Sequence, residues 1–476
     1  MKKFLLASFF FLLAAKGFSQ QFSQINTGTL YDSFENPSQR AFVPDTSKKY
    51  AFNFIIPNIS GNFSLTGDAQ ATLVSRAFGG KYNNSALLIG PGNNNIAIAN
   101  GGIYELMFKV FGSVNGDTEF GFFTETRFEG RGSFSDESIA AFNGTSAFPV
   151  NEYDNVFNNH FYDQVYNAIG LTYREEVIKK RLSIGFRLSY LMGIDYTKLD
   201  VRESQVEFDQ VNNAETISLR GRFYQSKGPG NFDGRSLLPT TRSPGAQISM
   251  GATYKTDDNV YVQGNIKDLG FINWYSGSTI SNFNTTAIAT NLVGKGREDS
   301  VFSKVNGILK NNRLMQRFNT YTDSKFELSA MKSYWLDEDM DWKYSPTLIG
   351  SKEIMYNGFT AGLVNHFQYM NKYHASLTVS YDNASLLGVG LQLMYKTYNG
   401  EFYIGSDKLM QTAELATAKS NYSSYTNGSF TGASFFMGFA LKFGPVIEHP
   451  LNSSVMETGE KGFLARLYNR LFKTYK

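Results

Sequence analysis

The sequence predicts an all-β protein, a transmembrane antiparallel β-barrel of about 14 strands (12 to 16), with a lumenal or irregular N-terminal segment and a C-terminal amphipathic helix. Two observations support this fold class. Apolar and polar residues alternate along many segments of the chain. Phe, Tyr and Gly are abundant, whereas charged residues make up 18% of the chain and the mean hydropathy is −0.28. A value below zero argues against a helical membrane protein.

Residues 432–443 show the alternation most clearly. One face carries Ala433, Phe435, Met437, Phe439, Leu441 and Phe443, and the other is mostly small or polar. A period of two defines a strand, and this distribution is typical of a wall with lipid outside and a polar lumen inside. A soluble β-sandwich would share the alternation, but it would leave many rows of Phe, Leu and Tyr uncovered.

Residues 1–19 have the pattern of a signal peptide. Lys2 and Lys3 precede an apolar run, residues 4–15, that is too short to span a membrane as a helix, and small residues stand before Gln20. We therefore expect export and localisation to the cell outer membrane; an N-terminal membrane anchor is the alternative. The chain contains no cysteine, which excludes disulfides and lipidation at a cysteine.

The remaining chain divides into an N-terminal segment or plug (residues 20–48), a barrel (49–443) and a periplasmic tail (444–476). Large loops are expected near residues 67–103, 130–162, 226–244 and 275–323. Residues 67–103 contain the turn signals GPGNNN and NGG, and a lumenal plug, a periplasmic excursion and a disordered loop all fit them. The short charged connection REEVIKKR is typical of a periplasmic turn, whereas long polar loops are typical of the extracellular side.

Several charged residues occupy the inward row of the predicted strands. Charges facing lipid cost several kcal/mol near the bilayer midplane, so these side chains should point to the lumen or lie at the rim. The set is Glu105, Lys109, Glu125, Arg127, Arg187, Lys255 and Lys442. They could line a polar path, or they could pair with one another across a closed lumen, which is the commoner arrangement.

The tail predicts an amphipathic, cationic helix over residues 459–476. Its apolar face would consist of Phe463, Leu464, Leu467, Tyr468, Leu471, Phe472 and Tyr475. This face could bind the membrane surface, dock on a protein partner, or pack against the periplasmic rim of its own barrel.

Three short motifs resemble known families. ENPSQRAF, residues 35–42, resembles the Asn-Pro-small element of the FadL superfamily of long-chain fatty acid transporters. NIKDLGFINW (265–274) and EFYIGSDKL (401–409) resemble elements of the DUF5723 family of Bacteroidota outer-membrane proteins. The resemblance implies an outer-membrane barrel with Asn36, Pro37 and Ser38 in a lumenal plug. FadL-type barrels move hydrophobic ligands, but the DUF5723 resemblance implies no established activity.

Motifs for catalysis or for cofactor binding are not found in the sequence. It has four histidines, of which His366 and His374 flank one predicted turn without an evident third metal ligand. The acidic stretch WLDEDMDW lacks the Gly and Glu that a calcium loop requires, so we interpret it as a solvated loop. We expect neither an enzyme nor a metal or cofactor site. The formal net charge of +3 is too small to indicate a nucleic-acid partner.

Two functions remain open at this stage. The first is FadL-like binding or passive transport of small hydrophobic compounds. The alternative is a non-enzymatic accessory or structural subunit of an envelope machine for secretion, gliding or barrel assembly, attached through the C-terminal helix. The expected partners are outer-membrane lipid, a hydrophobic small molecule and an envelope protein bound by that helix.

Overall fold

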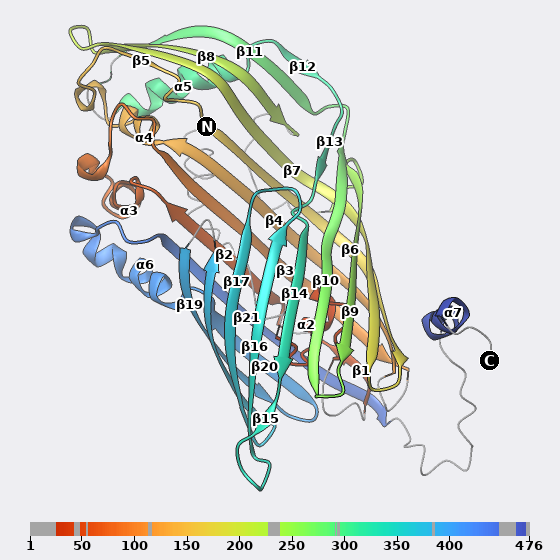
Figure 1. Ribbon diagram of the computed structural model, residues 1–476. Helices are drawn as coiled ribbons and strands as arrows, with labels where there is room; N and C mark the ends of the chain where they lie inside the picture. Colours follow the sequence, from red (N-terminus) through yellow and green to blue (C-terminus); the bar gives the residue numbers. More distant parts are fainter. Residues whose placement is uncertain are drawn as a thin grey trace, which may run out of the picture.

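The strands form a closed antiparallel barrel of 14 strands, which confirms the predicted fold class (Figure 1). The computed structural model describes residues 25–41, 48–53, 56–112, 117–226, 239–290, 292, 296–382, 386–446 and 463–472. The predicted signal peptide, residues 1–19, lies outside the described residues.

The barrel wall closes where the last strand meets the first. In order, the wall consists of β1 (Lys48–Phe52) with β2 (Asn58–Thr66), β3 (Asn94–Phe111), β4 (Thr118–Ser135), β6 (His160–Ile178), β7 (Leu182–Asp209), β9 (Pro244–Lys255), β10 (Val260–Trp274), β14 (Lys325–Lys332), β16 (Trp342–Glu353), β17 (Phe359–Tyr369), β18 (Tyr373–Asp382), β19 (Leu386–Lys396), β20 (Gly400–Ser406) and β21 (Thr431–Val446). β1 and β2 share one position, because each pairs with both β3 and β21.

The two ends of the barrel differ in their connections. Short turns join β6 to β7, β9 to β10, β17 to β18 and β19 to β20 at one end, here called the turn end, where β15 (Tyr334–Trp335) also lies (Figure 1). The opposite, loop end carries α3 (Gln70–Gly79), η2 (Asn84–Ala86), α4 (Asp136–Ala141), η3 (Thr145–Ala147), β5 (Glu152–Asp154), β8 (Ala214–Gln225), β11 (Thr279–Ala289), α5 (Arg297–Leu309), β12 (Arg313–Met315), β13 (Phe318–Tyr321), α6 (Leu409–Asn421) and η5 (Tyr422–Ser424).

Three of the segments expected as large loops contain regular structure. Residues 67–103 include α3 and the first part of β3, residues 130–162 include α4 and β5, and residues 275–323 include β11 and α5. The early part of β3 has small residues such as Ala97 and Ala99 where a lipid-facing strand has bulky ones, because a loop-end core covers them. For residues 226–244, positions 227–238 lie outside the described residues.

That loop-end core joins the strand extensions to the helices above the barrel. The far part of β7 leaves β9 and pairs with β8, which pairs in turn with β11. Phe148 stacks on Phe208 with 4.0 Å between ring centroids, and Phe283 and Ile308 are buried in the same cluster. Burial of this apolar surface stabilises a folded cap at the loop end, at the site where the sequence predicted loops.

The outer face of the wall is apolar and exposed. Leu171 on β6 is 62% exposed, Leu188 on β7 is 57% exposed and Leu393 on β19 is 52% exposed. Such rows of bulky side chains require a lipid environment, because water would leave them unfavourably hydrated. Among the described residues, no helix has both the length and the apolar character that a membrane crossing needs.

Candidate functional site

The N-terminal segment, residues 25–41, lies in the barrel lumen and includes the short helix α2 (Asp32–Glu35). Leu30 and Phe34 are completely buried. The Phe34 ring centroid lies 5.7 Å from that of Phe123 on β4, and the Tyr31 ring meets Tyr104 on β3 edge to face at 5.6 Å. These contacts, together with polar contacts to β7, β9, β10 and β20, show that the segment fills the part of the lumen nearer the turn end. It is called the plug below.

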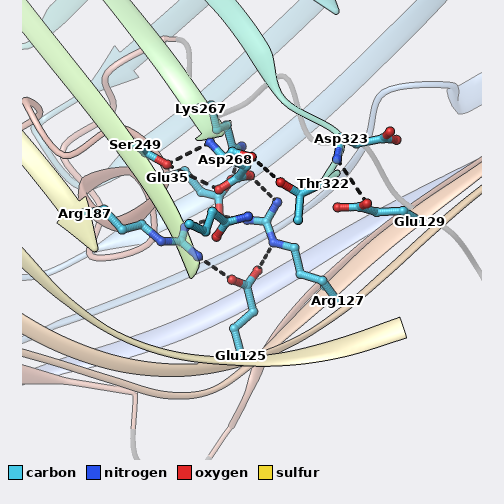
Figure 2. A network of polar contacts seen from close by, with 12 residues as sticks. Glu35, Glu125, Arg127, Glu129, Arg187, Ser249, Lys267, Asp268, Thr322 and Asp323 are labelled. Carbon is cyan, nitrogen blue, oxygen red and sulfur yellow. Dashed lines mark hydrogen bonds and ion pairs between the residues drawn. The ribbon is translucent and has the colours of Figure 1, made fainter. Parts of the chain in front are cut away.

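Glu35 at the end of α2 is the centre of a buried ion cluster (Figure 2). Its Oε1 lies 2.8 Å from Arg127 Nη2 on β4 and 3.6 Å from Arg187 Nη1 on β7. The ammonium of Lys267 on β10 forms an ion pair with Oε2, and the Tyr104 hydroxyl donates to Oε1. Three strands that are distant in the sequence are therefore joined to the plug by one carboxylate.

Two further carboxylates complete what we call the Glu35 cluster. Arg127 Nε lies 2.5 Å from Glu125 Oε1, and Arg127 Nη1 lies 2.6 Å from Asp268 Oδ2. Glu125 also accepts from Arg187 Nη2 at 2.6 Å. Three cations thus interlock with three carboxylates. Such balance is needed because removing one partner from a buried ion pair leaves an uncompensated charge, at a cost of about 3–5 kcal/mol.

A β-bulge in β10 brings both Lys267 and Asp268 into the cluster. The register of β10 against β9 shifts between Ile266 and Leu269, and Asp268 has a φ of 59°. The bulge is anchored by the Asp268 backbone N–H, which donates to Ser249 Oγ at 2.9 Å, and by the Asp268 carbonyl, which accepts from Thr322 Oγ1 at 2.6 Å. Regular alternation would point one of the two charged side chains into lipid. Sequence reasoning missed both residues; the adjacent Lys-Asp pair within a strand was the available signal.

The motif Asn36-Pro37-Ser38 forms a tight turn against the wall. Asn36 Oδ1 accepts from Ser38 N at 3.1 Å and from Ser38 Oγ at 2.8 Å, which closes the turn. Ser38 Oγ also lies 2.7 Å from Thr253 Oγ1 on β9, and the Ser38 carbonyl accepts from Arg174 Nε at 2.9 Å. The motif predicted as part of the plug therefore fixes the plug to β6 and β9.

Two wall glycines make room for this turn. Gly185 on β7 pairs with Gly251 on β9, and both face the lumen. A Cβ at Gly185 would overlap the Pro37 carbonyl, and one at Gly251 would overlap the Asn36 side chain. The backbone of the plug can approach the wall only because these positions lack side chains.

Further contacts hold the first half of the plug. Glu401 Oε1 on β20 accepts from the Leu30 backbone N–H at 2.6 Å, and Lys396 Nζ on β19 donates to the carbonyls of Thr27 at 3.0 Å and Gly28 at 2.8 Å. The motifs 265–274 and 401–409 thus both contact the plug, to which the motif 35–42 belongs. Glu401 and Lys396 are buried there, and their separation from the plug by about 370 residues of sequence gave no indication of these contacts.

A cavity lies between the plug and the loop end. It is open to solvent. Glu35, Arg127 and Lys267 of the Glu35 cluster line it together with polar residues of β2, β3, β16 and β18. In its wall, Glu129 Oε2 accepts from the Asp323 backbone N–H at 3.1 Å. The lining is therefore strongly polar and charged.

The structure separates the predicted lumenal residues into two groups. The first group faces the lumen and consists of Lys109, Glu125, Arg127, Arg187 and Lys442. Within it, Lys109 forms an ion pair with Glu119, with 3.0 Å between Nζ and Oε2.

The other two residues of that set lie elsewhere. The prediction that Glu105 faces the lumen is wrong. A register shift between Tyr104 and Leu106 turns Tyr104 inward and Glu105 to the exposed outer face. There Glu105 accepts a hydrogen bond from Thr126 Oγ1 at 2.5 Å. Lys255 lies half-buried at the turn end, with its Nζ 5.4 Å from the Tyr261 ring centroid, and does not reach the cluster.

The tail contains the helix α7 (Phe463–Phe472), within the predicted range 459–476. The Leu464 backbone N–H donates to Glu175 Oε2 on β6 at 2.8 Å, and Leu464 is 9% exposed. Phe463 and Leu467 are 64% and 42% exposed, and Tyr468 is half-buried. The side chains of Leu471 and Phe472 and all of Tyr475 lie outside the described part. The helix thus contacts β6 near the turn end and lies beside the barrel in Figure 1, and part of its apolar face is exposed.

The histidine pair noted in the sequence lies in the wall, away from the Glu35 cluster. His366 Nε2 and His374 Nδ1 are 3.2 Å apart, and His366 Nδ1 lies 2.7 Å from Ser376 Oγ. Within the described ranges, no group of three or more His, Cys, Asp or Glu side chains is placed to hold a metal ion.

Comparison with known proteins identifies a family. The sequence profile of the "Family of unknown function (DUF5723)" matches residues 41–407. No curated protein matches the chain.

Several solved barrels are similar in outline. A deletion mutant of the TodX monoaromatic hydrocarbon channel has a TM-score of 0.42 and 8% identity, with 90% of this chain and 98% of that chain covered. The toluene transporter TodX of P. putida has a TM-score of 0.39 and 9% identity, with 87% and 94% covered. The translocator domain of the autotransporter NalP from Neisseria meningitidis has 0.33 and 7%, with 87% and 92% covered.

We predict that Gly185→Val displaces the plug, because its side chain would occupy the space of the Pro37 carbonyl. The matched control is Gly264→Val on β10, where nothing lies within 4 Å of an added Cβ. The measurement is maleimide labelling of Ser33→Cys, a completely buried plug position in a chain that has no other cysteine. Labelling should be fast with Gly185→Val and slow in the control. Equal labelling would show that the plug does not depend on close contact at Gly185.

Proposed function

The chain belongs to the DUF5723 family, and we propose that it is a non-enzymatic outer-membrane β-barrel that binds a small solute in its lumenal cavity and passes it when the plug moves. The apolar outer wall and the closed hydrogen-bonded barrel support membrane residence. On this proposal the turn end faces the periplasm and the loop end faces the outside, as short turns and long loops do in bacterial barrels.

The observation that carries the proposal is the Glu35 cluster beneath an open cavity. The cavity is continuous with solvent, whereas the plug below it is held by ion pairs to β4, β7 and β10. A purely structural barrel would need neither an open cavity nor ion pairs between its plug and its wall. Apolar side chains can fill a lumen at a lower electrostatic cost. We infer that the plug closes the lumen and binds the wall at one defined position.

The chemistry of the lining bears on the solute. The sequence resemblance implied hydrophobic compounds, bound or passively transported. The apolar residues of the lining, such as Ile98, stand among charged ones that include Arg127, Lys267 and Glu327. A hydrophobic compound would gain little by entering this surface and would desolvate its charges. A polar solute therefore suits the cavity better, and a hydrophobic one would need a path through the wall.

A second function is supported by α7. Phe463 and Leu467 remain exposed although the helix is fixed to β6 through Leu464, and Arg466 and Arg470 are exposed beside them. An apolar strip flanked by cations could bind an envelope protein and make the barrel an accessory or structural subunit in secretion, gliding or barrel assembly.

We expect Glu35→Gln to raise the open probability of the purified protein in planar bilayers by about tenfold or more, because Arg127, Arg187 and Lys267 then lose their shared counter-charge in the plug. The matched control, Glu105→Gln, neutralises a carboxylate on the outer face and should behave as wild type. Vesicle uptake of glucose should rise with Glu35→Gln, whereas uptake of toluene should not. Unchanged conductance and unchanged glucose uptake would contradict the proposal, and a selective rise for toluene would favour a hydrophobic cargo.

The second function predicts a different result. Removal of residues 459–476 should release a specific envelope protein from the purified complex without changing barrel conductance. Phe463→Ser with Leu467→Ser should have the same effect, because these two exposed side chains form the free part of the apolar strip. If the barrel is isolated alone both with and without the tail, the accessory role is excluded.

A further inference from the structure

We propose that the lumenal cavity selects small organic cations with several hydrogen-bond donors, of the diamine class. This inference rests on the proposed function and names the chemical class of its solute. Two independent observations support it: the charge of the lining, and unused acceptor atoms in the wall.

The lining carries an excess of negative charge. Eight carboxylates and four cationic side chains line the cavity, which leaves a formal charge of −4. The carboxylates lie mainly toward the loop-end mouth. Asp323 lies two residues before β14, Glu353 and Asp382 are the last residues of β16 and β18, and Asp407 directly follows β20. A concave surface of one sign focuses the field and attracts ions of the other sign to its entrance.

The cations of the lining are largely committed to the protein. Arg127 takes part in three ion pairs of the Glu35 cluster, and Lys267 pairs with Glu35. Lys408 Nζ donates to the Phe63 carbonyl at 3.4 Å and lies 5.3 Å from the Phe430 ring centroid. Two of these cations therefore serve the plug. Lys408 also lies within electrostatic reach of Asp382 and Asp407, and Glu353 pairs with Arg131 at 2.5 Å, but the eight carboxylates of the lining still outnumber its four cations.

The second observation concerns two asparagines opposite each other in the wall. Asn62 on β2 pairs with Asn100 on β3, and both line the cavity. Within the described structure, the Oδ1 atom of each is buried without a hydrogen-bond donor, and Asn62 is only 9% exposed. Buried polar atoms are nearly always paired, so two adjacent orphan acceptors facing one cavity indicate a missing donor.

Ammonium groups fit both observations. An ammonium carries three donors, no acceptor and a positive charge, so it can satisfy the Asn62 and Asn100 carbonyls and lower the charge excess. A carboxylate solute would meet repulsion from the mouth. A neutral polyol could pair with the asparagines but would leave the charge uncompensated.

Isothermal titration of the purified full-length protein with three matched four-carbon probes tests this selectivity. 1,4-Diaminobutane should bind, whereas 1,4-butanediol and succinate should not. Asp382→Asn with Asp407→Asn should weaken diamine binding by about tenfold or more, and Asn62→Leu should also weaken it. The control, Glu203→Gln with Glu207→Gln, removes two exposed carboxylates from β7 outside the cavity and should change affinity less than about twofold. Equal binding of the diol or succinate, or unchanged affinity in the lumenal variants, would overturn the inference.

Reversal potentials of Glu35→Gln channels in a KCl gradient separate this inference from the proposed function. Cation preference would support the inference. Conductance without cation preference would refute the selectivity and leave the proposed function standing. If the channels never conduct, the proposed function fails, and the titration still decides whether the cavity binds the diamine.

Discussion

The arrangement of the lumen depends on the pairing of one buried carboxylate, that of Glu35. A charge removed from water must be compensated, and Glu35 is 2% exposed. Its compensation requires Arg127, Arg187 and Lys267 to reach the same point from β4, β7 and β10. This requirement fixes the position of α2 and explains why the plug occupies one defined position in the lumen.

The other features of the plug follow from that position. Once Glu35 is seated, the turn that follows it lies directly against β7 and β9, where only glycine fits. The segment before it passes β19 and β20, where Lys396 and Glu401 bind its backbone and replace the hydrogen bonds it would make with water. Above the plug lies the cavity, whose lining includes the carboxylates near the loop end and the two asparagines with unpaired Oδ1 atoms.

The wall strands could be predicted from the sequence because one physical rule governs them. Lipid outside and a polar lumen inside impose a period of two, and β19 and β21 follow it closely. The rule fails where the backbone leaves regular geometry. The bulge at Glu105 reversed the faces of Glu105 and Tyr104, and the bulge at Asp268 placed two neighbours on one side. A strict period of two in the sequence does not allow for an extra residue in a strand. The sequence predicted large loops where the cap lies, because the cap strands face a protein core instead of lipid.

The candidate site was only partly accessible to sequence reasoning. Charged residues could be assigned to the lumen because lipid excludes them, and the plug motif could be recognised as a resemblance. The partners of each charge are set by how the barrel closes, since Arg127, Arg187 and Lys267 lie 92, 152 and 232 residues from Glu35 in the sequence. In the sequence, Gly185 and Gly251 resemble any small lumenal residue. Only the structure shows that the plug backbone lies beside them.

The most direct test of the central claim is disulfide formation between Ser38→Cys and Thr253→Cys in native membranes, in a chain with no other cysteine. The two hydroxyl oxygens lie 2.7 Å apart, so a plug seated in the lumen should give an oxidised, intramolecular bridge that blocks labelling of both thiols. Two thiols that remain reduced and react freely with maleimide would contradict the account.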